Sequence, residues 1–93
     1  MDKIILVITG RKVCFLQFCK KYNYNPHSNK VIHISRLRDL LGLNLHNVIY
    51  EAFITYGYQN INIKELIDIE DYLYTYNIKF EYKDYWEVYN QCF

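Results

Sequence analysis

The stretch KIILVIT, residues 3–9, is the feature that most restricts how this 93-residue chain can fold. It is a β-branched run without polar alternation, and such a run predicts a strand that is buried on both faces at the centre of a parallel sheet. After Gly10 the apolar residues recur at helical spacing until the segment NYNP, where Pro26 prevents continuation. The start of the chain therefore predicts a strand, a tight turn and a helix.

The rest of the chain alternates between strand-like and helix-like segments. Strands are predicted at residues 30–34, 47–54 and 78–83, the last as a half-exposed edge strand because apolar and charged residues alternate along it. Ser35 and Gly42 are expected to cap the two ends of a short helix over RLRDLL. Asn62 and Glu65 are expected to form a capping box at the start of a longer helix, which reaches residue 76. Residues 55–60 read as a loop, and the segment 84–93 stays open between strand and helix.

This alternation predicts one domain over residues 1–93 with an α/β fold. We expect a small Rossmann-like sheet of about four mostly parallel strands with two main helices, in two or three layers. A hydrophobic content of 52% supports a folded chain rather than a disordered one.

Charge and cysteine content restrict the compartment and the partners. The formal net charge is +1, so the chain as a whole has neither the basic excess of a DNA-binding domain nor the acidic excess of a DNA mimic. Three cysteines without a secretory signal favour a reducing compartment over a disulfide scaffold. The opening apolar run is too short to span a membrane. We expect a cytoplasmic protein that has no membrane contact.

Gly10 raises the possibility of a phosphate-binding turn at the start of a helix. Neither G-x-x-x-x-G-K-[ST] nor G-x-G-x-x-G is present, so the turn is interpreted first as a connector. A ligand could still bind around the carboxyl end of the sheet, where Ser35 follows the second strand. The candidate ligand-binding residues are Thr9, Gly10, Arg11, Lys12 and Ser35.

No cluster of residues predicts a catalytic centre, a metal or a cofactor. Cys14 and Cys19 are five residues apart, about 140° around a helix, so they do not converge on one metal and are expected in the core. The three histidines lack a ligand spacing. The acidic residues of the second main helix fit its solvent face; they are Glu65, Asp68, Glu70 and Asp71.

Basic residues gather in the first forty positions and acidic residues after position 64. A neutral protein can therefore have one positive end, and nearby tyrosines could add aromatic contacts with nucleic acid or with an acidic protein surface. An ordinary solvated helix face would give the same pattern. The candidate contact residues are Lys20, Lys21, Tyr22, Tyr24, Arg36, Arg38, Tyr56 and Tyr58.

The first sixty residues resemble a group of small phage-encoded proteins with a TG…F…W/FC…NP segment, a short strand and an LRGL-like turn. The resemblance implies an α/β fold, a viral origin and the cytoplasm of a host cell. It implies no mechanism, because the group has no assigned activity. The matching positions are Thr9, Gly10, Phe15, Phe18, Cys19, Asn25, Pro26, Ser35, Leu37, Arg38, Leu40, Gly42 and Leu43.

We therefore expect a non-catalytic phage protein that binds a host or viral macromolecule, most of all a protein, with inhibition of a bacterial defence system as one form of this function. Two alternatives stay open. One is binding or sequestering of a nucleotide or phosphate ligand at the Gly10 turn, and the other is nucleic-acid binding through the basic half. A homodimer by sheet extension is also open, although charges on the edge strand oppose indiscriminate pairing.

Overall fold

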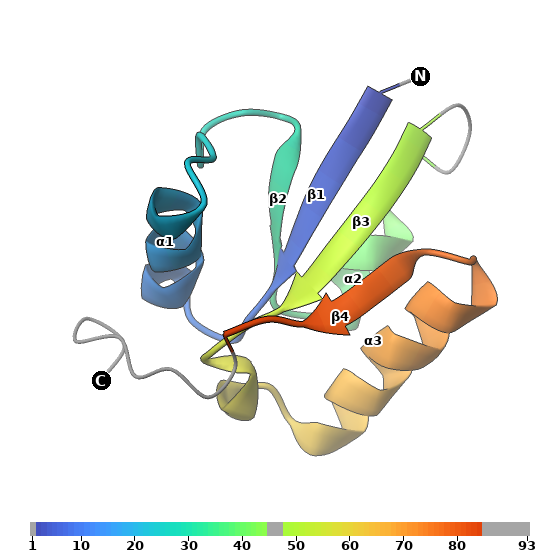
Figure 1. Ribbon diagram of the computed structural model, residues 1–93. Helices are drawn as coiled ribbons and strands as arrows, with labels where there is room; N and C mark the ends of the chain where they lie inside the picture. The colour runs from blue at the N-terminus through green and yellow to red at the C-terminus, as the bar shows by residue number, and fades with distance from the viewer. Residues whose placement is uncertain (1, 45–47, 85–93) are drawn as a thin grey trace.

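The computed structural model describes residues 2–44 and 48–84 and contains a four-stranded sheet in which all neighbouring strands are parallel (Figure 1). The strand order is β2-β1-β3-β4, so the first strand lies inside the sheet and β2 and β4 form its edges. The α/β fold with mostly parallel strands is confirmed. The strands are β1 (Asp2–Ile8), β2 (Val31–Ile34), β3 (Val48–Ile54) and β4 (Lys79–Tyr82).

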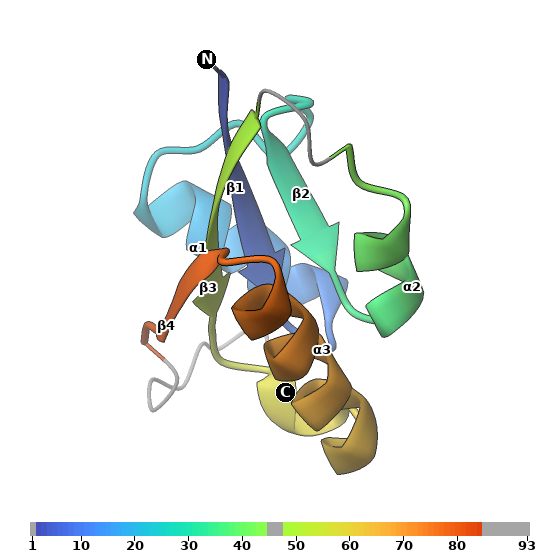
Figure 2. The ribbon, with the colours of Figure 1, turned by 90° about the vertical axis from the view of Figure 1, so that its right-hand side faces the viewer.

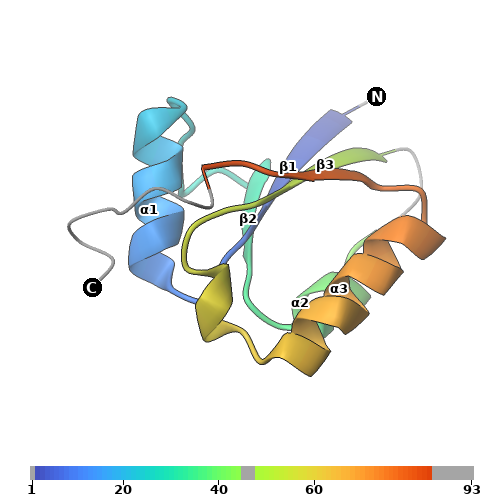
Figure 3. The same cartoon turned by 60° about the horizontal axis from the view of Figure 1, so that its bottom comes forward.

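Helices cover both faces of the sheet, which gives three layers (Figures 2 and 3). The helix between β1 and β2 lies on one face, and the two helices that follow β2 and β3 lie side by side on the other. A single turn of 3-10 helix precedes the last of them. The bounds are α1 (Lys12–Lys21), α2 (Leu37–Leu41), η1 (Tyr58–Asn60) and α3 (Ile63–Thr75).

The apolar run of β1 supplies side chains to both layers of the core. Ile5 and Val7 pack in the cluster beneath α1, and Leu6 and Ile8 pack in the cluster beneath α2 and α3. Because side chains alternate across a strand, a strand covered on both faces needs apolar residues at every position. This explains why KIILVIT has no polar alternation and confirms its place at the centre of the sheet.

Asparagines end the two longer helices by the same geometry. Asn23 has φ of 63°, and the N–H of the following Tyr24 donates to the carbonyl of Cys19 at 2.8 Å. Asn77 has φ of 57°, and the N–H of Ile78 donates to the carbonyl of Leu73, also at 2.8 Å. Left-handed residues close helices in this way, as the NYNP segment predicts for the first helix.

The ends of α2 and α3 differ from the sequence prediction in three places. The N-cap of α2 is Arg36 instead of Ser35, and Gly42 has φ of −90°, outside the left-handed region. Asn62 does cap α3, accepting the N–H of Lys64 at 2.9 Å. Glu65, however, binds the N–H of Leu37 instead of completing a capping box at Asn62, because a tertiary donor lies within reach.

The two cysteines of α1 are both fully buried, as expected, but they differ in covalent state. Cys19 is a free thiol whose pKa is raised by burial. Cys14 is disulfide-bonded, so the reduced state expected from the odd number of cysteines is wrong for this residue. A count of cysteines cannot tell which thiols pair. Of the segment 84–93, which the sequence leaves open between strand and helix, residues 85–93 lie outside the described residues.

The described part of the chain contains no helix that is both long enough and apolar enough to cross a membrane.

Candidate functional site

The Gly10 turn lies at the carboxyl end of β1, where parallel sheets usually bind ligands. The N–H of Gly10, which would face a phosphate, donates to the carbonyl of Gly57 at 3.0 Å. Beside it, the fully buried hydroxyl of Thr9 donates to the carbonyl of Tyr56 at 2.8 Å. The segment that leads into η1 therefore occupies the position above this turn.

Close packing explains why glycine stands at both positions of this contact. A Cβ atom on Gly10 would lie 2.8 Å from the backbone carbon of Asn60. Gly57 has φ of +97°, and a Cβ there would lie 2.3 Å from Oγ1 of Thr9 and 2.8 Å from Sγ of Cys14. The two glycines allow η1 to lie directly on the start of α1. Gly10 thus serves this internal contact, in addition to turning the chain.

The next turn, between β2 and α2, is also occupied by groups of the chain itself. The N–H groups of Ser35 and Arg36 donate to Oδ2 of Asp39 at 3.0 and 3.1 Å, and the N–H of Leu37 donates to Oε2 of Glu65 at 2.8 Å. Three successive amides thus bind carboxylates, where an anionic ligand would otherwise bind. Glu65 is therefore not simply a solvent-facing residue of α3.

The candidate ligand residues do lie at one edge of the sheet, since the N–H of Thr9 donates to the carbonyl of Ile34 just before Ser35. The N–H groups of Thr9, Gly10 and Ser35, however, donate to other groups of the chain. The side chain of Lys12 is exposed and that of Arg11 is half-buried.

His33 is a packing residue at the same edge. Its Nε2 atom lies 2.9 Å from the carbonyl oxygen of Thr9, and its ring stacks on Phe15 with the centroids 4.9 Å apart. Within residues 2–44 and 48–84, no three His, Cys, Asp or Glu side chains are grouped so as to hold a metal ion.

The basic contact residues do not form one surface. Lys20 and Lys21 end α1 on one face of the sheet, whereas Arg36 and Arg38 belong to the α2 region on the other (Figure 3). The Nζ atom of Lys21 also lies 3.3 Å from Oδ2 of Asp84, a buried carboxylate at the end of β4. A sequence cluster of basic residues is thus divided by the fold.

The tyrosines in the candidate contact set are largely packed on other rings. Tyr22 and Tyr24 lie against Phe18, with centroid distances of 4.7 and 6.3 Å, and the hydroxyl of Tyr22 donates to Asp84. The ammonium group of Lys83 lies 4.5 Å from the centroid of the Tyr22 ring. These rings extend the core beneath α1 to its margin, and only part of each faces solvent.

The other two candidate tyrosines lie near the carboxyl edge. Tyr56 contributes its carbonyl to the Thr9 contact, and Tyr58 packs edge-to-face on Tyr82 with the centroids 5.4 Å apart. The hydroxyl of Tyr82 donates to Oε1 of Glu70 at 2.5 Å. Burial and this bond to a carboxylate raise the pKa of Tyr82 above that of an ordinary tyrosine. Glu70, like Glu65, therefore has a structural partner instead of facing only solvent.

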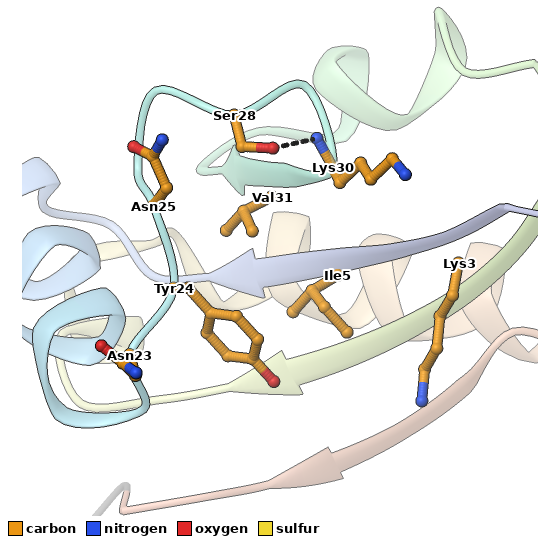
Figure 4. A pocket seen from close by; sticks show the side chains of 8 residues that line it. All are labelled: Lys3, Ile5, Asn23, Tyr24, Asn25, Ser28, Lys30 and Val31. Atoms are coloured by element: carbon orange, nitrogen blue, oxygen red, sulfur yellow. Dashed lines mark hydrogen bonds between the residues drawn. The ribbon is translucent and has the colours of Figure 1, made fainter.

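An open groove of about 410 Å³ lies at the opposite, amino-terminal part of the sheet, which we call the amino-edge groove (Figure 4). Apolar side chains of Ile5, Tyr24 and Val31 lie in its middle, with polar side chains around them. It is bounded by β1, the start of β2 and the loop between α1 and β2. The full lining is Lys3, Ile5, Asn23, Tyr24, Asn25, Ser28, Lys30 and Val31.

Short local hydrogen bonds shape the loop that forms one wall of the amino-edge groove. Oδ1 of Asn25 accepts the N–H of His27 at 3.0 Å, and Oγ of Ser28 accepts the N–H of Lys30 at 3.1 Å. Such side-chain-to-backbone bonds hold a loop in one conformation without regular secondary structure. Hydrogen bonds within the loop thus hold this wall of the groove in place, and β1 and β2 form its floor.

The charged side chains that line the amino-edge groove are basic. Two of its eight lining residues are lysines and none is acidic. Glu51 lies nearby, 3.5 Å from the Nζ atom of Lys3, and balances the charge of that lysine in part. A groove with an apolar floor and a cationic rim can bind an acidic segment that also carries an apolar side chain.

The sequence predicts only part of the amino-edge groove. Tyr24 was a candidate contact residue and Lys30 belonged to the basic region, but Lys3 and the polar loop residues were missed. The NYNPHS stretch contains Asn, Pro and Ser, three residue types that favour turns, and it could have indicated a loop of fixed conformation.

No protein-family model, curated protein or solved structure matches the chain.

Proposed function

We propose that this protein is a small non-catalytic binding protein of phage origin, which acts on a host or viral protein. Inhibition of a bacterial defence system is the specific form that we favour. The main support is the carboxyl edge of the sheet, where the N–H of Gly10 and those of the β2–α2 turn, Ser35, Arg36 and Leu37, bind groups of the chain itself. An α/β enzyme or nucleotide-binding protein uses that edge for its ligand. The phage origin follows from the sequence resemblance alone.

The amino-edge groove is our proposed contact site, and an acidic segment of a protein is the proposed occupant. Lys3 and Lys30 would bind carboxylates, while an apolar side chain of the partner would rest on Tyr24, Ile5 and Val31. Charges at the rim of such a contact mainly govern association and selectivity, and burial on the apolar floor contributes affinity.

Affinity capture from a nuclease-treated lysate of infected bacteria tests the proposal. The double variant Lys3→Glu/Lys30→Glu reverses both cationic groups of the groove. Lys12→Glu/Lys64→Glu changes the net charge equally at two exposed lysines outside the groove. We expect the control to retain one captured protein that the groove variant loses by at least tenfold.

Three results would overturn this function. Equal capture by both double variants would exclude the amino-edge groove as the contact site. Loss of capture on nuclease treatment would favour nucleic acid, whose phosphate-driven binding also weakens steeply as salt rises. A thermal shift of several degrees with phosphate, nucleotides or cyclic dinucleotides at fixed salt would favour a ligand-binding protein.

A further inference from the structure

The edge strand β4 carries an unusual combination of exposed features. It pairs with β3 on one side, and no other strand of the described residues pairs with it. A groove of about 340 Å³ lies between this strand and the end of α3, lined by Leu73, Tyr74, Asn77, Ile78, Lys79 and Phe80. An open strand edge beside an apolar groove is a common place for another strand to add to a sheet.

The helix α3 presents a second apolar stripe, separate from the one in the core. Ile63, Ile67 and Tyr74 are 75%, 54% and 81% exposed, and their spacing places them on one face of the helix. Glu70 shares this face and binds Tyr82 of β4. The exposed stripe therefore lies on the side of α3 that is nearer the open edge of the sheet.

The opposite side of α3 is occupied by α2. Glu65 binds the N–H of Leu37, and the hydroxyl of Tyr72 donates to the carbonyl of Leu40 at 3.2 Å. An apolar stripe with no cover from α2, next to an open strand, indicates a partner that continues both the sheet and the helix layer.

We propose that this partner is a second copy of the chain, paired antiparallel through β4 and centred on Phe80. In this register Lys79 of each copy lies opposite Glu81 of the other, which gives two opposite-charge pairs, and Phe80 lies opposite Phe80. Both α3 helices then lie on the same face of a continuous eight-stranded sheet. Their exposed stripes face each other across the two-fold axis, and helices in contact pack about 8–10 Å apart.

The charges select this register over its neighbours. Registers centred on Lys79 or Glu81 also keep both helices on one face, but they place Lys79 opposite Lys79 or Glu81 opposite Glu81. Like charges directly opposite one another are unfavourable across strands. The same charges that discourage indiscriminate strand addition therefore favour the pair centred on Phe80 over these two neighbouring registers.

Sedimentation or light scattering over a range of protein concentrations tests this dimer with a charge-swap series. Lys79→Glu and Glu81→Lys each place like charges opposite one another, so we expect each variant alone to dimerise at least tenfold more weakly. The double variant Lys79→Glu/Glu81→Lys restores both pairs and should dimerise like the wild type. An equimolar mixture of the two single variants should form a heterodimer.

A matched control changes charges on the solvent side of α3. Lys64 and Asp68 are exposed and lie outside the Ile63–Tyr74 stripe. The variants Lys64→Glu and Asp68→Lys should therefore leave dimerisation unchanged. Circular dichroism verifies that every variant folds. A wild type that stays monomeric at all concentrations would overturn the proposal. So would single charge reversals that leave the dimer intact, or a double variant that fails to recover. None of these results depends on the amino-edge groove or its partner.

Discussion

Replacing Gly57 with alanine should destabilise the protein far more than a single methyl group normally does. Gly57 has φ of +97°, in the left-handed region where a side chain costs about 1–2 kcal/mol. The added Cβ would also lie 2.3 Å from Oγ1 of Thr9 and 2.8 Å from Sγ of Cys14, both of them fully buried. The segment before η1 must therefore move away from the start of α1.

Three contributions add to the expected loss. Backbone strain costs about 1–2 kcal/mol, overpacking of a tight contact about 1–3 kcal/mol, and loss of the Thr9–Tyr56 hydrogen bond about 1 kcal/mol. Because relaxation relieves one term at the expense of another, we expect about 3–5 kcal/mol in total. A domain of this size is stable by only about 5–15 kcal/mol, and each kcal/mol shifts its Tm by roughly 4–8 °C.

Urea unfolding followed by far-ultraviolet circular dichroism measures this loss. Gly42→Ala is the matched control, because a Cβ at Gly42 meets nothing within 4 Å and φ there is −90°. We expect the control to change the free energy of unfolding by less than about 1 kcal/mol. A Gly57→Ala protein within 1 kcal/mol of wild type, or a control that loses as much, would refute the reasoning that η1 is packed tightly on the Gly10 turn.

Two further predictions concern buried and partly buried hydroxyl groups. Thr9 and Thr55 are both fully buried, but the Thr9 hydroxyl donates to Tyr56, whereas the hydroxyl of Thr55 has no hydrogen-bond partner among the residues that the structure describes. Thermal or urea unfolding should therefore show that Thr55→Val stabilises the protein by about 1 kcal/mol and that Thr9→Val destabilises it by about 1–3 kcal/mol; the same sign for both would contradict the hydrogen-bond assignment. The raised pKa of Tyr82 means that its contribution to stability is complete below about pH 10, the pKa of an unfolded tyrosine, and is lost at higher pH. Tyr82→Phe should thus show a shallower alkaline decline in the free energy of unfolding, and an unchanged slope would exclude the titration of Tyr82 as a cause of that decline.

The parts of the fold that could be predicted from the sequence are those with a local cause. KIILVIT has apolar side chains at every position because β1 is covered on both faces, and the helix after Gly10 has one apolar stripe because it is covered on one. Asn23 precedes the break at Pro26 and takes the left-handed conformation that closes α1. Each of these signals lies within the segment that it describes.

The parts that could not be predicted depend on contacts between distant segments. Nothing near Gly10 shows that Gly57 will accept its N–H, and nothing near Leu37 shows that Glu65 will bind it. The basic residues looked like one cluster because they are close in sequence, but successive helices of an α/β sheet can lie on opposite faces. The amino-edge groove combines β1, β2 and a loop, so no single motif describes it.

The position of β1 inside the sheet also affects how the chain must fold as it is synthesised. β1 leaves the ribosome before the other three strands, yet Ile5 is paired with Val31 on one side and Glu51 on the other, so its neighbours are made later. Parallel pairing between such distant segments slows folding and leaves strand edges exposed in the meantime. The apolar segment β1 therefore stays only partly covered until β3 has been translated. A chain interrupted before residue 54 lacks the complete strand that pairs with the other edge of β1, and it is prone to aggregate.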